Sequence, residues 1–262
     1  MKGKLPNIRE DFSAWYNAVL RLAGWVRDVS TPGCFVVMPP AYAVWELIQA
    51  QLDSMIKAMG VKNAYFPLLF PASLLQKEAE HVAGFAAEVA LVTHSRLEMS
   101  ESGVLVPSGK LEEPLVVRPT SEMIMYEVYA AMIHGESQLP VLLNQWANVV
   151  RWELRTRLFL RTLEFLWQEG HCVHASHGES LRFLLAILHD VYNKFCEEWL
   201  AIPVVAGAKP ANKRFPGADD TFTIEALMGD GRALQMGPRH DLGQTFAQAL
   251  GLTFQGRDGK LH

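Results

Sequence analysis

The chain has 262 residues, half of them apolar, and a formal net charge of −4. It can therefore bury a sizeable core, and its charge is unlike that of a strongly basic nucleic-acid binder. Its three cysteines form no CxxC pair, and the N-terminal segment carries no apolar signal region. We therefore expect reduced thiols, no membrane span and a cytoplasmic location.

The first part of the chain predicts short strands between amphipathic helices. Apolar residues recur at helical spacing between residues 11 and 27. Pro39 and Pro40 suit the first turn of a long helix, and Gly60 suits its C-terminal cap. The predicted elements are a helix over 11–27, a strand over 34–38, a helix from 39 to its cap at 60, and a strand over 63–70.

The middle of the chain contains a polar stretch between apolar segments. Residues 95–113 carry two glycines and an interior proline, so we expect a mobile excursion there. Further along, two long apolar-rich segments flank a basic loop. The predicted elements are paired strands over 88–94 and 115–117, a helix over 121–134, and strands over 141–153 and 161–174 joined by 154–160.

The last part predicts a helix over 178–200 and a hairpin whose turn is Gly229-Asp230-Gly231. Strands mostly follow strands, which favours an α+β domain on an antiparallel sheet. No GxGxxG or Walker-type loop is present, so a nucleotide would not be held in the usual way at a helix N-terminus. The remaining predicted elements are strands over 202–205, 221–227, 233–236 and 252–255, and a helix over 241–250.

Four arginines fall within eleven residues, with Glu153 among them. Guanidinium groups suit phosphate and carboxylate, although arginines at a hairpin tip are often only solvated. In an extended strand, Arg151 and Glu153 share a face because side chains alternate. The arginines are Arg151, Arg155, Arg157 and Arg161.

Thr120 and Glu122 lie two residues apart where a strand leads into a helix. Both residue types favour helix starts, as caps and through the helix dipole. Met123 and Ile124 stand where a capping box would need Glu or Gln, which leaves Glu122 free for another partner such as an ammonium group. Together with the arginines, this pattern suits a small cationic amine held beside a polyphosphate.

Three histidines, His171, His174 and His177, could suggest a metal site. Offsets of three in a strand place neighbouring side chains on opposite faces, and no Cys or carboxylate completes a tetrahedral set. We therefore predict no metal bound by protein side chains. The sequence leaves open whether Phe85, Trp167 and Phe215 are core or pocket residues, and whether Gln235 and His240 are only polar turn groups.

The chain resembles prolyl-tRNA synthetases, which are class II aminoacyl-tRNA synthetases. RPTSE at residues 118–122 is similar to the proline-recognition loop of that family, and NVVRWELRT with FLRTLEFLWQEGH is similar to its motif 2. The segment from GCFVV to LLFP is similar to motif 1. The resemblance implies one catalytic domain over 1–262, with motif 1 at about 33–71 and motif 2 at about 144–171. It also implies an antiparallel sheet flanked by helices, and a homodimer formed through motif 1.

The resemblance further implies that ATP, with Mg²⁺, activates L-proline to prolyl-adenylate, and that the prolyl group then passes to tRNA(Pro). It implies a catalytic role for Arg151. The implied proline-binding residues are Thr120, Glu122, Phe85, Glu88, Trp167, His171, Phe215 and His240. The implied ATP-binding residues are Arg151, Glu153, Arg161, Thr162, Phe165 and Gln235.

The sequence departs from the family pattern in ways that put adenylate formation in doubt. The sequence holds neither motif 3 nor an anticodon-binding domain, and Gly237-Pro238-Arg239-His240 stands where Gly-Thr-Ser-His is usual. Met38 and Pro32 stand where arginines are usual. We expect impaired activity of this chain alone. The alternative is a short paralogue that acts as a binding or dimerisation module. A related synthetase for threonine or glycine is disfavoured by RPTSE together with Trp167.

Overall fold

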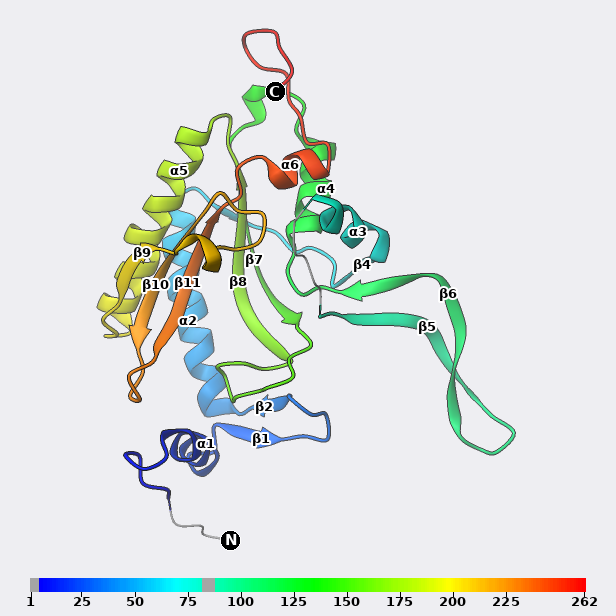
Figure 1. Ribbon diagram of the computed structural model, residues 1–262, viewed down its shortest axis with the longest axis vertical. Helices are drawn as coiled ribbons and strands as arrows, with labels where there is room; N and C mark the ends of the chain where they lie inside the picture. The colour runs from blue at the N-terminus through cyan, green and yellow to red at the C-terminus, as the bar shows by residue number, and fades with distance from the viewer. Residues whose placement is uncertain (1–4, 82–87) are drawn as a thin grey trace.

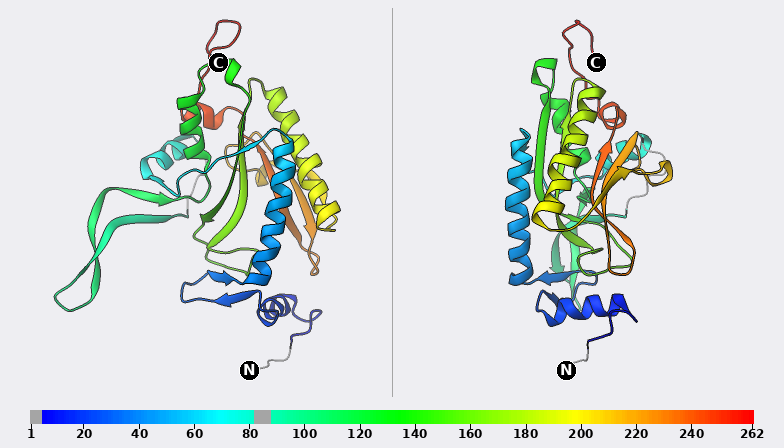
Figure 2. Two further views of the ribbon diagram at one scale, coloured as in Figure 1. Left: turned by 180° about the vertical axis from the view of Figure 1, so that it is seen from behind. Right: turned by 90° about the vertical axis from the view of Figure 1, so that its left-hand side faces the viewer.

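The computed structural model describes residues 5–81 and 88–262. Two three-stranded sheets stand at its centre, and α2 (Pro39–Ala58) and α5 (His177–Ala186) run along one side of them (Figures 1 and 2). A second group of helices, α3 (Ala72–His81), α4 (Glu122–Met132) and α6 (Thr245–Ala249), packs together beside the other end of the central strands. Within the described residues, no helix is both long enough and apolar enough to cross a bilayer.

The N-terminal unit consists of α1 (Phe12–Leu22) and the strand pair β1 (Val26–Asp28) and β2 (Phe35–Val37). The predicted helix over 11–27 is too long. Gly24 has φ +70°, a left-handed conformation that ends the helix and turns the chain into β1.

The predicted strand over 63–70 is also wrong, because two short strands in different sheets replace it. β3 (Lys62–Asn63) pairs in parallel with β7, whereas β4 (Leu69–Pro71) pairs with β6. Between them the chain crosses the core at Phe66, whose backbone N–H donates to Gln145 Oε1 at 2.6 Å. Helix α3 follows β4 directly and was not predicted.

The strands predicted over 88–94 and 115–117 do pair, and they continue as a long hairpin through most of the polar segment 95–113. β5 (Ala90–Met99) and β6 (Leu105–Val117) pair antiparallel and project from the body (Figure 1). The pairing continues to Met99 and Leu105, and Ser100 closes the turn by donating to the Val104 carbonyl at 2.8 Å. Cross-strand pairing therefore overrides the polar composition on which the prediction depended.

The sheet nearest the site has the strand order β3-β7-β8, with β7 (Val141–Val150) antiparallel to β8 (Glu164–Val173). Its register runs from Val141 opposite Val173 to Val150 opposite Glu164. β7 ends at residue 150 instead of the predicted 153, and β8 begins at residue 164 instead of the predicted 161. The loop between them therefore spans 151–163. A short 3₁₀ helix, η1 (Glu136–Gln138), precedes β7.

The second sheet has the order β11-β10-β9, formed by β9 (Val205–Ala208), β10 (Asp220–Leu227) and β11 (Ala233–Asp241). Three predictions differ here. β9 lies further along than 202–205, β11 continues beyond 236 through the Gly-Pro-Arg-His segment, and 252–255 contributes only isolated bridges at Gln255. The helix predicted over 178–200 continues from α5 as the π-helices η2 (Ile187–Asn193) and η3 (Phe195–Trp199), and η4 (Ala211–Lys213) is a 3₁₀ turn.

The two sheets meet along unpaired edges. Among the described residues, β8 pairs with β7 and β11 pairs with β10, and no pairing joins β8 to β11. Apolar clusters lie on both sides of this junction, one around α4 and α6 and the other between α2 and η2. The expected α+β architecture is confirmed, with the parallel β3–β7 contact as its exception.

His177 ties the start of α5 to the end of β11, since its Nε2 lies 2.6 Å from Asp241 Oδ2. The hydrogen bond and charge of Asp241 raise the pKa of His177 above its ordinary value. A raised folded-state pKa stabilises the fold fully below about pH 6.5, and this stabilisation is lost as the pH rises through the folded pKa. The variant H177Q should therefore lose more stability at about pH 5.5 than at about pH 8.5 in urea unfolding. An equal loss at both pH values would contradict a charged pair.

Candidate active site

A buried arginine anchors the turn between β6 and α4. Arg118 is 0% exposed, and its guanidinium donates to the Phe66 carbonyl at 2.7 Å and to the Asn148 carbonyl at 2.8 Å. A third bond reaches Asn148 Oδ1 at 3.0 Å. These bonds fasten the turn to β7 and occupy Arg118, so this arginine has a structural task.

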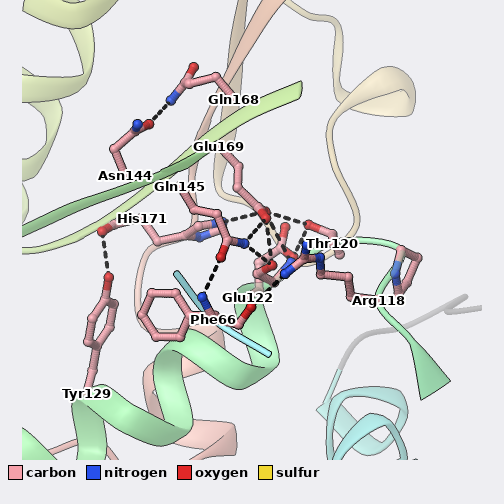
Figure 3. A network of polar contacts seen from close by, with 12 residues as sticks. Phe66, Arg118, Thr120, Glu122, Tyr129, Asn144, Gln145, Gln168, Glu169 and His171 are labelled. Atoms are coloured by element: carbon pink, nitrogen blue, oxygen red, sulfur yellow. Dashed lines mark hydrogen bonds and ion pairs between the residues drawn. The ribbon is translucent and has the colours of Figure 1, made fainter. Parts of the chain in front are cut away.

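Glu169, on β8, is the second anchor of the same turn. Its carboxylate accepts the Ser121 backbone N–H at 3.1 Å, the Ser121 hydroxyl at 2.6 Å and Gln145 Nε2 at 2.9 Å (Figure 3). Burial opposes ionisation, but the hydrogen bonds from His171, Ser121 and Gln145 outweigh it and hold the pKa of Glu169 below its usual range. An ionised carboxylate therefore lies inside the protein, 6% exposed.

Glu122 is a second buried carboxylate beside the first, also 6% exposed. The Thr120 hydroxyl donates to Glu122 and lies 3.5 Å from Glu169 Oε2 (Figure 3). His171 Nε2 lies 3.4 Å from Glu169 Oε2. Burial opposes protonation of His171, but Glu169 and the charge of Glu122 outweigh it and raise its pKa.

Neither carboxylate forms an ion pair with a lysine or arginine in the described part of the chain. Two buried carboxylates and one imidazole thus lie close together. Buried charges are normally paired or coordinate metals. This cluster is therefore suited to a small cation or an amine.

Arg151 supplies positive charge to the same cavity. Its Nε donates to the Pro119 carbonyl at 3.0 Å, and its guanidinium lies over the rings of Phe165 and Trp167, at 5.4 Å and 5.0 Å from their centroids. Glu153, which might have neutralised it, pairs instead with Arg161 at 2.8 Å. Within the described residues no carboxylate forms an ion pair with Arg151, so its terminal nitrogens can bind an anion.

The opposite wall is formed by Phe215 and His240, whose ring centroids are 4.5 Å apart. Thr221 Oγ1 accepts the Phe215 backbone N–H at 2.9 Å and lies 3.0 Å from His240 Nδ1. The Thr221 hydroxyl can therefore donate its proton to Nδ1 of His240. Nδ1 accepts a hydrogen bond only when it carries no proton, that is, when the imidazole is neutral. Burial and the charges of Arg239, His171 and Arg151 lower the pKa of His240 to about 4, in agreement with that state.

Arg239 points away from the carboxylate cluster. Pairing places Arg239 opposite Phe222 on the helix-covered face of the sheet, whereas its neighbour His240 pairs with Thr221 on the other face. The guanidinium lies over Tyr192 at 4.1 Å from the ring centroid, and the Tyr192 hydroxyl donates to Gln168. The unusual arginine of this chain therefore does not block the space between Glu122 and His240.

A cavity of about 1250 Å³ lies along the unpaired edges of β8 and β11 and brings eight predicted site residues together. In the described part of the chain, the buried polar side-chain atoms without a partner are Trp167 Nε1, His174 Nδ1 and Arg239 Nε. All three residues line this cavity. The eight predicted residues are Thr120, Glu122, Arg151, Trp167, His171, Phe215, Gln235 and His240.

Other predicted residues lie outside the cavity wall. Thr162 turns inward and donates to the Glu164 carbonyl at 2.7 Å, and Glu88 is exposed, with its carbonyl accepting the Trp152 N–H at 3.2 Å. Phe165 lies behind Arg151, and Glu153 and Arg161 pair with each other at the surface. Phe85 lies outside the described residues.

Sequence reasoning missed Glu169, Ser121 and Gln145. Glu169 could have been found, because it lies between Trp167 and His171 at strand spacing and so shares their face. The sequence predicted no carboxylate that completes a tetrahedral metal set with the histidines, but Glu122 and Glu169 both lie beside His171. The other two histidines have partners of their own, as expected if they do not share a metal site with His171. The ring centroids of His174 and Phe183 are 5.3 Å apart, and His177 forms a hydrogen bond with Asp241.

Comparison with known proteins connects this chain to one family of enzymes. The family described as tRNA synthetase class II core domain (G, H, P, S and T) matches residues 107–262. The chain is 54% identical over 256 residues to Proline--tRNA ligase 2 of Anaeromyxobacter dehalogenans, and 53% identical over 254 residues to Proline--tRNA ligase of Paramagnetospirillum magneticum. These alignments cover 98% and 97% of this chain but 50% of each relative, so the chain spans about half the length of the curated relatives it matches.

Two crystal structures of prolyl-tRNA synthetase from Cryptosporidium parvum share the fold. One, complexed with halofuginone and AMPPNP, gives a TM-score of 0.88 at 38% identity and covers 98% of this chain and 49% of that one. The other, complexed with L-proline and AMP, gives 0.86 at 37% identity and covers 99% and 49%. The resemblance and the class II fold expected from the motifs are therefore confirmed.

The anchoring role of Glu169 predicts a loss of stability on amide substitution. In E169Q an amide nitrogen replaces one acceptor and confronts the donors of Ser121 or Gln145, which should lower the free energy of unfolding by about 1–3 kcal/mol. Urea unfolding measures this, with E127Q, an exposed position on α4, as the control. If both variants were equally stable, Glu169 would not anchor the turn.

Proposed function

Because the chain belongs to the class II tRNA synthetase core family, we propose that it is the catalytic domain of a prolyl-tRNA synthetase. It would activate L-proline with ATP to prolyl-adenylate and transfer the prolyl group to tRNA(Pro). The observation that carries this proposal is that one cavity holds both the buried carboxylates of Glu122 and Glu169 and the guanidinium of Arg151, which forms no ion pair with a carboxylate of the described residues.

The carboxylate side would hold the imino nitrogen of proline. Protonated proline is a secondary ammonium with two N–H donors, and Glu122 and Thr120 offer acceptor oxygens to it. Glu169, on β8, adds a second carboxylate beside Glu122. The hydrogen bonds that it accepts from Ser121 keep the neighbouring Thr120 and Glu122 in place. A charge-assisted bond of this kind is roughly twice as strong as a neutral one.

The arginine side would hold the anions that react. The proline carboxylate and the α-phosphate of ATP repel each other by about 4 kcal/mol at 4 Å with an effective dielectric near 20. A guanidinium that contacts both offsets much of this repulsion, and the contact strengthens as charge moves to the leaving group. Arg151 fits this task because the aromatic rings and the Pro119 carbonyl hold it without neutralising it.

The walls of the cavity would enclose the pyrrolidine ring. Trp167, Phe215 and His240 present ring surfaces, and His240 does so as a neutral group. A small apolar ring gives the pocket few contacts by which to select proline over other amino acids, because each methylene contributes only about 1–3 kcal/mol to such discrimination. Recognition of the imino nitrogen by Glu122 and Thr120 must therefore supply much of the specificity.

The nucleotide would bind towards the loop over 151–163. The resemblance assigns Glu153, Arg161, Thr162, Phe165 and Gln235 to ATP, and Gln235 lies on the cavity wall. Mg²⁺ would neutralise phosphate charge, and it takes oxygen ligands and keeps several waters. Glu153 is already paired with Arg161, so we place Mg²⁺ with the phosphates of ATP rather than on a protein carboxylate.

We also propose a cytoplasmic homodimer formed through residues 33–71. The outer surface of this segment carries exposed apolar side chains, among them Leu47 at 73% and Tyr65 at 71% exposure. A contiguous exposed apolar patch is typical of a protein interface, and we infer that these side chains would meet the partner subunit. The alternative is a non-acylating paralogue, which Pro238-Arg239 favours, although Arg239 lies over Tyr192 and leaves the space beside Glu122 open.

Replacing Glu122 by Gln should weaken L-proline binding. The variant keeps the size of the side chain but removes the charge, and a hydrogen bond to a charged group is worth about 1.5–3 kcal/mol, or roughly 10–100-fold in affinity. Isothermal titration measures the dissociation constant. The control is E127Q, an exposed position on the same helix, which should bind like the wild type. Unchanged affinity in E122Q would rule out this amine site.

Replacing Arg151 by Gln should weaken binding of a prolyl-adenylate analogue by about 10–100-fold, since one charge-assisted contact to the phosphate is lost. Competition titration against the wild type measures the effect. R155Q changes an exposed arginine of the same loop and serves as the matched control. If R155Q were affected and R151Q were not, the phosphate would lie outside the cavity.

A further inference from the structure

We propose that Glu122, Glu169 and His171 form a binding site for a divalent transition-metal ion of the zinc type. Each side chain offers one ligand atom, and the three atoms lie within 4.8 Å of one another. They come from two elements, the first turn of α4 and alternate positions of β8. The site rests on this geometry, and only its competition with proline rests on the proposed function.

The spacing of the donors suits tetrahedral coordination. Zinc binds imidazole nitrogen at about 2.0–2.1 Å and carboxylate oxygen at about 2.0–2.2 Å, so adjacent ligand atoms in a tetrahedron are about 3.3–3.5 Å apart. Glu169 Oε2 and His171 Nε2 are already 3.4 Å apart. The Glu122 carboxylate is bound only by the Thr120 hydroxyl in the described part of the chain, so it can move to the third position.

The charges of the cluster also favour a divalent cation. Two buried carboxylates face each other without a lysine or arginine partner among the described residues. With His171 as the neutral imidazole that metal binding requires, a divalent ion balances both carboxylates, whereas a monovalent ammonium balances one. The guanidinium of Arg151 also lines this cavity, but it lies over the rings of Phe165 and Trp167 and forms no ion pair with either carboxylate.

The surroundings fix one ligand and leave one coordination position open. Ser121 and Gln145 donate to Glu169 and orient its carboxylate, as outer partners of metal ligands commonly do. Glu122, Glu169 and His171 all line the large cavity. Three protein ligands with an open fourth position are typical of zinc sites that exchange ligands. A water molecule or an incoming amine would take that position.

Metal binding and proline binding should exclude each other. The proposed function uses the Glu122 carboxylate for the imino nitrogen, and the same oxygen would ligate the metal. Zinc would then act as a competitive inhibitor of amino-acid binding rather than as a cofactor.

The test is titration of the full chain, free of any affinity tag, with zinc chloride by calorimetry and with Co²⁺ by visible absorption. We expect one equivalent bound, with the d–d absorption of a four-coordinate site. E122Q and H171Q should each weaken zinc binding at least about tenfold. The matched control is H262Q, which removes an exposed imidazole 2.9 Å from the Asp258 carboxylate and should change nothing.

Competition in the wild type keeps the test independent of variant folding. With L-proline at about ten times its own dissociation constant, the apparent zinc dissociation constant should rise about tenfold. No zinc binding by the wild type, or binding that persists in E122Q and falls in H262Q, would overturn the site. Zinc binding that requires Glu122 but ignores proline would support the metal site and contradict the proposed amine site, so the two proposals fail separately.

Discussion

The buried carboxylate of Glu169 is the constraint on which the site depends. It accepts both donors of Ser121 and one from Gln145, and Gln145 in turn accepts the backbone N–H of Phe66. One side chain therefore joins β8, β7, the start of α4 and the crossing segment before β4. An unpaired buried donor costs about 1–3 kcal/mol, so these groups are held in one arrangement, and Thr120 and Glu122 are held with them.

The same cavity holds charges of both signs. Negative charge gathers where β8 meets α4, and positive charge lies at the end of β7, where Arg151 rests on aromatic rings instead of on a carboxylate. Screening by water is weak at buried positions, so the carboxylates of Glu122 and Glu169 act strongly on a ligand. A zwitterion such as an amino acid fits this field in only one orientation, which places its carboxylate beside the nucleotide phosphate.

Much of this could be predicted from sequence where the signal was local. Pro39-Pro40 marked the start of α2, and the lack of a capping box indicated that Glu122 was free. Other features depend on contacts between distant segments. Glu169 meets Thr120 across 49 residues of sequence, the pairing of β5 with β6 overrides a polar composition, and the direction of Arg239 follows from the register of β11 with β10. No single-sequence pattern reports these contacts.

The most direct test of the account is a crystal structure of the chain with L-proline bound. The account predicts that the imino nitrogen lies within hydrogen-bonding distance of Glu122 and Thr120, and that the carboxylate points to the guanidinium of Arg151. A proline molecule bound in the reverse orientation, or bound outside the cavity between β8 and β11, would contradict it.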